Sequence, residues 1–128
     1  MRVLVVDDDA DLTGALTKML ARRGHTVELL TSGFGVVNRV AGREGTAPDV
    51  VVLDVMMPAL SGEEVLTMLA KEPATRGVPV VLYSAVDKGS LDRIAAAHPR
   101  CAGLQKGGGL TELIQAVQRA ASGNASSA

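Results

Sequence analysis

The chain of 128 residues has the length of one domain and leaves no room within it for a second folding unit. Hydrophobic residues make up 47% of it but aromatic residues only 2%, which favours an aliphatic α/β core over an aromatic-rich β-sandwich. The net charge is −1 and the basic residues are scattered, which excludes the electrostatic footprint of a nucleic-acid or anionic-membrane binder. We therefore expect no direct contact with nucleic acid or membrane.

The sequence also carries no targeting or spanning segment. No apolar run approaches the roughly 20 residues that a membrane-spanning helix needs, and Arg2 leads straight into a predicted strand without a signal-peptide pattern. The single cysteine, Cys101, cannot form an internal disulfide, which agrees with a reducing compartment. These features predict a cytoplasmic protein.

The first predicted strand, residues 3–6, is apolar throughout and leads directly into three acids, Asp7, Asp8 and Asp9. Apolar residues at helical spacing then predict a helix from about residue 10 to 23, with Asp9 or Asp11 as its N-cap.

The next strand, residues 26–30, alternates only partly and is predicted to lie nearer the sheet edge. A second helix is predicted to carry Phe34, Val37, Val40 and Ala41. Residues 50–53 are four consecutive aliphatic residues, as in strands buried on both faces, and this run stops abruptly at a carboxylate, Asp54.

The remaining elements continue the alternation of strands and helices. Ser61 is predicted to cap the third helix, with acids in its first turn that complement the helix dipole. A strand at 80–83, a weaker helix around 91–95, a short strand at 102–105 and a last helix around 110–117 follow. We expect the folded domain to span residues 1–121 and residues 122–128 to form a flexible tail.

Five strands alternating with five helices predict right-handed parallel crossovers in a doubly wound sheet. Of the two common doubly wound strand orders, five strands fit the flavodoxin-like order 2-1-3-4-5. The predicted fold class is therefore α/β, with (βα)5 topology.

Four of the five predicted strands end in polar or charged residues: Asp7 and Asp8, Asp54, Ser84 and Lys106. The carboxyl ends of parallel strands lie on one edge of the sheet, so these side chains are expected to share one shallow pocket. Three carboxylates in one pocket repel each other unless a cation lies among them. Mg²⁺, which prefers oxygen ligands, meets that need.

An acid nucleophile, a metal, a lysine and a hydroxyl together match the requirements of phosphoryl transfer to a carboxylate. Taken singly, most of these residues are better explained without a site: Asp8 or Asp9 as a helix cap, Ser84 as a turn residue and Lys106 as a solvated strand end. The coincidence of four strand ends favours a shared site.

At these residues the chain resembles the receiver domains of two-component response regulators, over about residues 1–121. The family carries an acid pair after the first strand, an Asp followed by x-x-M-P and then Gly, a Ser or Thr followed by Ala, and a Lys. In this sequence the corresponding residues are Asp7 and Asp8, then Asp54 with Met57, Pro58 and Gly62, then Ser84 with Ala85, and finally Lys106.

The resemblance implies that Asp54 is the phosphoacceptor and that Ser84 and Lys106 bind the phosphoryl oxygens. It implies a histidine kinase or phosphotransfer protein as donor and a downstream protein whose binding is switched, with the chain a monomer or weak dimer. Beyond assisting its own phosphorylation and dephosphorylation, the chain is expected not to be an enzyme.

The resemblance also implies how Mg²⁺ is held. Asp8 would be a direct ligand, Asp7 a ligand through water, and Asp54 and the main-chain carbonyl of Met56 further ligands.

Two departures from the family pattern concern the chain around the lysine. The family usually has Tyr or Phe three residues before it, whereas this sequence has Gly103 unless a one-residue deletion shifts the register. Glycines replace the proline that usually follows the lysine. We therefore predict a trans Lys106–Gly107 bond, because a cis bond without proline costs about 2.5–4 kcal/mol, and positive φ angles at Gly107 and Gly108.

Three alternative functions fit the sequence less well. A receiver-like interaction module that works without phosphorylation is favoured by Gly103 and the glycine-rich turn, although no acid and no lysine is lost. A phosphohydrolase with an Asp nucleophile generally needs a second Asp two residues later, where Met56 stands. A dinucleotide-binding fold is disfavoured because no G-x-G-x-x-G follows the first strand.

Overall fold

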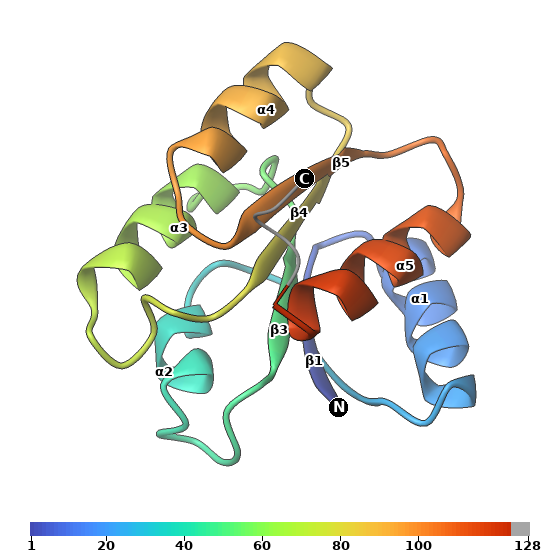
Figure 1. Ribbon diagram of the computed structural model, residues 1–128, viewed down its shortest axis with the longest axis horizontal. Coiled ribbons are helices and arrows are strands. Elements are labelled where there is room, and N and C mark those ends of the chain that lie inside the picture. Colours follow the sequence, from blue (N-terminus) through green and yellow to red (C-terminus); the bar gives the residue numbers. More distant parts are fainter. Residues whose placement is uncertain (124–128) are drawn as a thin grey trace.

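The computed structural model describes residues 1–123 and, within them, one sheet of five strands (Figure 1). The strands are β1 (Arg2–Val6), β2 (Thr26–Leu30), β3 (Val50–Leu53), β4 (Val80–Ser84) and β5 (Cys101–Gln105). All neighbouring strands pair in parallel, in the order β2-β1-β3-β4-β5. The predicted fold class and strand order are confirmed.

Helices cover both faces of the sheet, as Figure 1 shows. They are α1 (Ala10–Arg22), α2 (Val36–Val40), α3 (Gly62–Lys71), α4 (Lys88–Ala96) and α5 (Leu110–Ala121). α1 and α5 pack on one face and α2, α3 and α4 on the other, so each face has its own hydrophobic cluster.

The central strand β3 shows why an uninterrupted aliphatic run was needed. Val50 and Val52 belong to the cluster under α1 and α5, whereas Val51 and Leu53 belong to the cluster under the other three helices. Successive side chains of a strand point to opposite faces, and here both faces are covered. Each of these side chains contributes about 1.5–3 kcal/mol by its burial, and together they hold the strand that leads into Asp54.

Side-chain caps fix where α1 and α3 begin. The Asp9 carboxylate accepts hydrogen bonds from the N–H groups of Asp11 (3.1 Å) and Leu12 (3.2 Å), so Asp9 rather than Asp11 is the N-cap of α1. Ser61 Oγ accepts from the N–H of Glu64 at 3.2 Å, and the Glu64 carboxylate accepts from the N–H of Ser61 at 3.3 Å. This capping box confirms the predicted cap of α3.

The second helix is shorter than predicted. α2 has five residues and begins at Val36, so Phe34 lies outside it and is 64% exposed. Gly35 adopts a left-handed φ of +88°, which no helical residue can have. Gly33 packs tightly, because a Cβ there would lie 2.7 Å from Val65 Cγ2. The two glycines therefore hold this segment in a loop despite its helical spacing of apolar residues.

At the C-terminal end of the chain, Ser122 is the C-cap of α5. Residues 124–128 of the predicted tail lie outside the described residues, and the tail stays a prediction. Among residues 1–123 no helix is long and apolar enough to cross a membrane.

Candidate functional site at the carboxyl edge of the sheet

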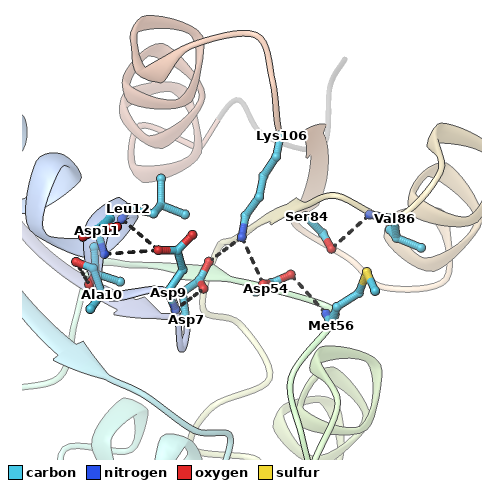
Figure 2. Close-up of polar contacts among 11 residues, drawn as sticks. Asp7, Asp9, Ala10, Asp11, Leu12, Asp54, Met56, Ser84, Val86 and Lys106 are labelled. Carbon is cyan, nitrogen blue, oxygen red and sulfur yellow. Dashed lines mark hydrogen bonds and ion pairs between the residues drawn. The ribbon is translucent and has the colours of Figure 1, made fainter.

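Parallel pairing brings four strand ends to the same level. Leu53 of β3 pairs with Val6 of β1 on one side and with Leu82 of β4 on the other. Ser84, at the end of β4, pairs with Gln105 of β5. Asp7, Asp54 and Lys106 directly follow their strands and Ser84 is the last residue of β4, and Figure 2 shows these four side chains together. The sequence-based expectation that these residues share one edge is therefore met.

The ammonium group of Lys106 lies between two carboxylates. Its Nζ is 3.0 Å from Asp7 Oδ2 and 3.1 Å from Asp54 Oδ2 (Figure 2). The carboxylate side chains are only 4% and 6% exposed, while that of Lys106 is 22% exposed. One partly buried cation thus pairs with two acids that are almost removed from water, an arrangement that offsets part of their desolvation cost.

The other oxygen of each buried carboxylate is held by the loop that follows it. Asp7 Oδ1 accepts a hydrogen bond from the N–H of Asp9 at 2.9 Å, and Asp54 Oδ1 accepts one from the N–H of Met56 at 3.0 Å. Such bonds to the residue two positions later are typical of Asp at the start of a turn. They leave one oxygen of each carboxylate facing Lys106.

Burial and pairing oppose each other in the pKa values of the site. Burial raises the pKa of Asp7, helped by the nearby Asp54 charge and partly offset by the hydrogen bonds from Asp9 and Lys106. Burial alone would lower the pKa of Lys106, but its hydrogen bonds to Asp7 and Asp54 outweigh that effect and the pKa is raised. Lys106 is therefore charged at neutral pH.

Oxygen atoms of Asp7, Asp8 and Asp54 lie within 4.8 Å of one another. Asp8 is exposed, and within residues 1–123 its carboxylate has no hydrogen-bond or ion-pair partner. Its oxygens are therefore free to bind a metal ion from solvent. A set of carboxylate oxygens with one side open to water suits Mg²⁺, which keeps several waters when bound. The predicted ligand role of the Met56 carbonyl stays a prediction.

Ser84 is completely buried and lies on β4 next to Asp54. Its Oγ accepts a hydrogen bond from the N–H of Val86 at 3.4 Å, and its carbonyl accepts from the N–H of Lys106 at 2.8 Å. No contact joins the hydroxyl to Asp54 or to the Lys106 ammonium within the described residues. The oxygen thus accepts a bond from its own loop, while the hydroxyl proton has no acceptor within the described residues.

Gly62 allows α3 to start directly against the phosphoacceptor candidate. Its N–H donates to the carbonyl of Val55 at 2.9 Å. A Cβ at this position would lie 2.3 Å from the Asp54 carbonyl oxygen and 2.7 Å from Val55 Cα. Only a residue without a side chain fits here, which gives a physical reason for the glycine of the sequence pattern.

Gly103 lies three residues before Lys106 on β5, which pairs continuously with β4 from Val80 and Cys101 onward. Leu91 of α4 fills the space, because a Cβ on Gly103 would lie 2.8 Å from Leu91 Cγ. α4 therefore packs against the β5 backbone where the family usually has an aromatic ring.

The loop after Lys106 contains no cis peptide bond, as the described residues contain none, so the Lys106–Gly107 bond is trans as predicted. Gly107 has a φ of +116°, but the second positive φ is at Gly109 (+88°) and not at Gly108. The predicted conformational role of glycine is correct for Gly107 and wrong for Gly108, because Gly109 makes the turn as the N-cap of α5.

Two neighbours of the site were not singled out from the sequence. Gln105 donates from Nε2 to the Val86 carbonyl at 3.0 Å and so ties the end of β5 to the loop after β4. The Lys106 ammonium also lies 5.9 Å from the ring centroid of Tyr83. The sequence feature that could have pointed to Tyr83 is its aromatic ring in an otherwise aliphatic strand, directly before Ser84.

The chain matches the family model described as "Response regulator receiver domain" over residues 3–118. Over 95 residues it is 38% identical to Response regulator MprA of Mycobacterium sp. (strain KMS). The aligned region covers 74% of this chain and 39% of MprA. It is 34% identical over 87 residues to Protein PilH of Pseudomonas aeruginosa, covering 68% of this chain and 69% of PilH. The chain thus spans well under half of MprA.

Solved structures agree with the fold. The receiver domain of the Francisella response regulator 1452 superposes with a TM-score of 0.81 at 25% identity, covering 94% of this chain and 96% of that one. The Vibrio cholerae chemotaxis protein CheY4 gives a TM-score of 0.80 at 21% identity, covering 93% and 97%.

Proposed function

The chain belongs to the family of response regulator receiver domains of two-component signalling, and from that membership we propose that Asp54 accepts a phosphoryl group from a histidine kinase or phosphotransfer protein. The proposed outcome is a changed affinity for a downstream protein. In this proposal the chain is a switch that assists its own phosphorylation and dephosphorylation and has no separate substrate.

The observation that carries the proposal is the position of the Lys106 ammonium, within 3.1 Å of the buried Asp54 carboxylate and 3.0 Å of Asp7. A lysine used only as a solvated strand end would extend into water. Here the charge is directed to the place where a phosphoryl group on Asp54 would carry its oxygens, as electrostatic stabilisation of phosphoryl transfer requires.

In the proposed transfer, an oxygen of Asp54 forms a bond to phosphorus while the bond from phosphorus to the donor's imidazole nitrogen breaks. The electron pair of that bond stays on the nitrogen, which is protonated as it leaves. Lys106 then binds a phosphoryl oxygen. The Ser84 hydroxyl, which only accepts a hydrogen bond from Val86 in the structure, donates its own proton to another.

Asp7, Asp8 and Asp54 would hold Mg²⁺, with the Met56 carbonyl as a further ligand by family resemblance. When bound, the ion supplies positive charge that neutralises the phosphoryl oxygens. The role of the chain is to present these oxygens on the rigid ends of two central strands.

The test of this proposal is the intact mass of the protein after incubation with acetyl phosphate and Mg²⁺. We expect a mass increase of one phosphoryl group, which is absent in EDTA and absent in the Asp54→Asn variant. A protein that is folded and binds Mg²⁺ but gains no mass under any of these conditions would refute it.

A second candidate function is a receiver-like interaction module that works without phosphorylation. The observation that favours it is the packing of Leu91 on Gly103, which leaves no aromatic residue at that position to respond to the site. A pull-down with beryllofluoride-treated protein and with Asp54→Asn separates the two functions. Equal capture of the same partner by both proteins would support the module.

The phosphorylated state is expected to be long-lived for this family. By resemblance, the side chains at Met56 and Val86 flank the path of the attacking water, and neither can orient a water molecule. Replacing Met56 with Asn and Val86 with Glu should shorten the half-life of the phosphorylated protein at least several-fold, as measured by the loss of phosphoryl mass with time.

Met68→Asn is the matched control for this experiment, since Met68 is exposed on α3 as Met56 is exposed beside the site. It should leave the half-life unchanged. Unchanged or slower decay in the Met56 and Val86 variant would overturn the expectation.

A further inference from the structure

Tyr83 is the only Phe, Tyr or Trp side chain of the protein that is buried, because the sequence contains one Tyr, one Phe and no Trp, and Phe34 is exposed. It lies on β4 directly before Ser84, is 4% exposed, and packs in the cluster under α1 and α5. The single large ring of an otherwise aliphatic core is thus placed beside the candidate site.

The Lys106 ammonium lies 5.9 Å from the centroid of this ring. That distance is within the range in which a cation is attracted by an aromatic ring. Burial of the ring excludes water from one side of the lysine side chain, which makes such an attraction stronger than at an exposed site. Tyr83 is therefore the third neighbour of the ammonium, beside Asp7 and Asp54.

The other two neighbours take part in the proposed reaction. Asp54 would carry the phosphoryl group and Asp7 would bind Mg²⁺ through water, so neither offers Lys106 the same contact before and after transfer. Backbone restraint is also weak, because three glycines follow Lys106 and two of them have positive φ angles. The ring is the one of the three neighbours that takes no part in the proposed reaction.

We propose that Tyr83 is a positioning residue that holds the Lys106 ammonium over the acidic pocket through the face of its ring. Its consequence for phosphorylation rests on the proposed function of Asp54, whereas the contact itself does not. A Tyr83 that only filled the core would affect stability without affecting the position of Lys106.

The contact is measured first, by NMR of the metal-free parent protein. Because no other Phe, Tyr or Trp is buried, ring-current shifts of the Lys106 side-chain methylene signals report on Tyr83. We expect upfield shifts in the parent and in Tyr83→Phe, and shifts near those of an exposed lysine in Tyr83→Leu. Unshifted Lys106 signals in the parent overturn the proposal, and this arm does not depend on any variant folding.

The consequence is measured by the rate of phosphorylation against acetyl phosphate concentration with Mg²⁺. We expect Tyr83→Leu to lower the rate at saturating donor by about two- to fivefold, and Tyr83→Phe to keep the parent rate. Val81→Ala is the control, because Val81 is buried on the same strand and face. It should lower stability and leave both the rate and the Lys106 shifts unchanged.

A Tyr83→Leu protein with the parent rate overturns the proposal, and so does a Tyr83→Phe protein as slow as Tyr83→Leu, because the ring face would then not be the acting group. If the parent itself is not phosphorylated, the proposed function of Asp54 fails, while the Lys106 shifts still decide whether Tyr83 holds the ammonium.

Discussion

Replacing Gly62 with alanine is expected to lower the free energy of unfolding by about 3 kcal/mol or more, the upper end for an overpacked interior. The added Cβ would lie 2.3 Å from the Asp54 carbonyl oxygen and 2.7 Å from Val55 Cα. Both are backbone atoms, which cannot rotate away as a side chain can. Since the clash falls on Asp54 itself, phosphorylation should also slow, and chemical denaturation with a phosphorylation assay measures both effects.

Gly14→Ala is the matched control, because Gly14 also lies in a helix, α1, but a Cβ there would meet nothing within 4 Å. This substitution is expected to stabilise the protein by up to about 1 kcal/mol through helix propensity alone. If Gly62→Ala were as stable as Gly14→Ala, the close approach of α3 to Asp54 would be wrong.

Replacing Lys106 with methionine is expected to lower the stability of the metal-free protein by about 1–3 kcal/mol at neutral pH. Removing one partner of a buried ion pair costs more than this, but Lys106 is partly exposed and the cost is reduced accordingly. In the proposed function the ammonium and Mg²⁺ bind the same carboxylates, so Mg²⁺ should stabilise the variant by more than it stabilises the parent.

The pH dependence of the Lys106→Met effect follows from Asp7. Its pKa is raised in the folded protein, mainly by burial, and the hydrogen bond from Lys106 lowers it. Without Lys106 the folded pKa rises further above the ordinary value of 3.8. At a pH between the unfolded-state pKa and the raised folded-state pKa of Asp7, the native state binds more protons than the unfolded state. The stability of the variant therefore falls as the pH rises through this range.

Thermal melts in EDTA at pH 4 and pH 7 should therefore show a larger loss for Lys106→Met at pH 7. Lys88→Met is the control, since Lys88 forms only an exposed pair with Asp92 at 2.8 Å, which is worth at most about 0.5 kcal/mol. A loss that is equal at both pH values, or no larger than that of Lys88→Met, would contradict the bridging role of Lys106.

The architecture was predictable because strong local signals agree with the global fold. The aliphatic run at residues 50–53, the caps at Asp9 and Ser61, and the acids that follow the first and third strands all follow from single-residue chemistry. The start of the second helix was not predictable from periodicity. It depends on Gly33 packing against Val65 and on the left-handed Gly35, which are tertiary and backbone features.

Within the site, the residues could be named from the sequence but their contacts could not. The bridging of two carboxylates by one ammonium, the hydrogen bond of the Ser84 hydroxyl to its own loop and the ring of Tyr83 depend on side-chain conformations set by burial. The space beside Gly103 is a similar case, because the sequence shows the missing side chain but not that Leu91 fills its place.

The most direct test of the account is to locate the phosphoryl group within the acidic cluster. Phosphorylated protein is treated with borohydride, which reduces an aspartyl phosphate to homoserine, and the modified residue is then found by peptide mass analysis. We predict modification at Asp54 alone, dependent on Mg²⁺ and abolished by Asp54→Asn. Modification at Asp7 or Asp8 in the parent protein, or none anywhere in protein that has gained phosphoryl mass, would contradict it.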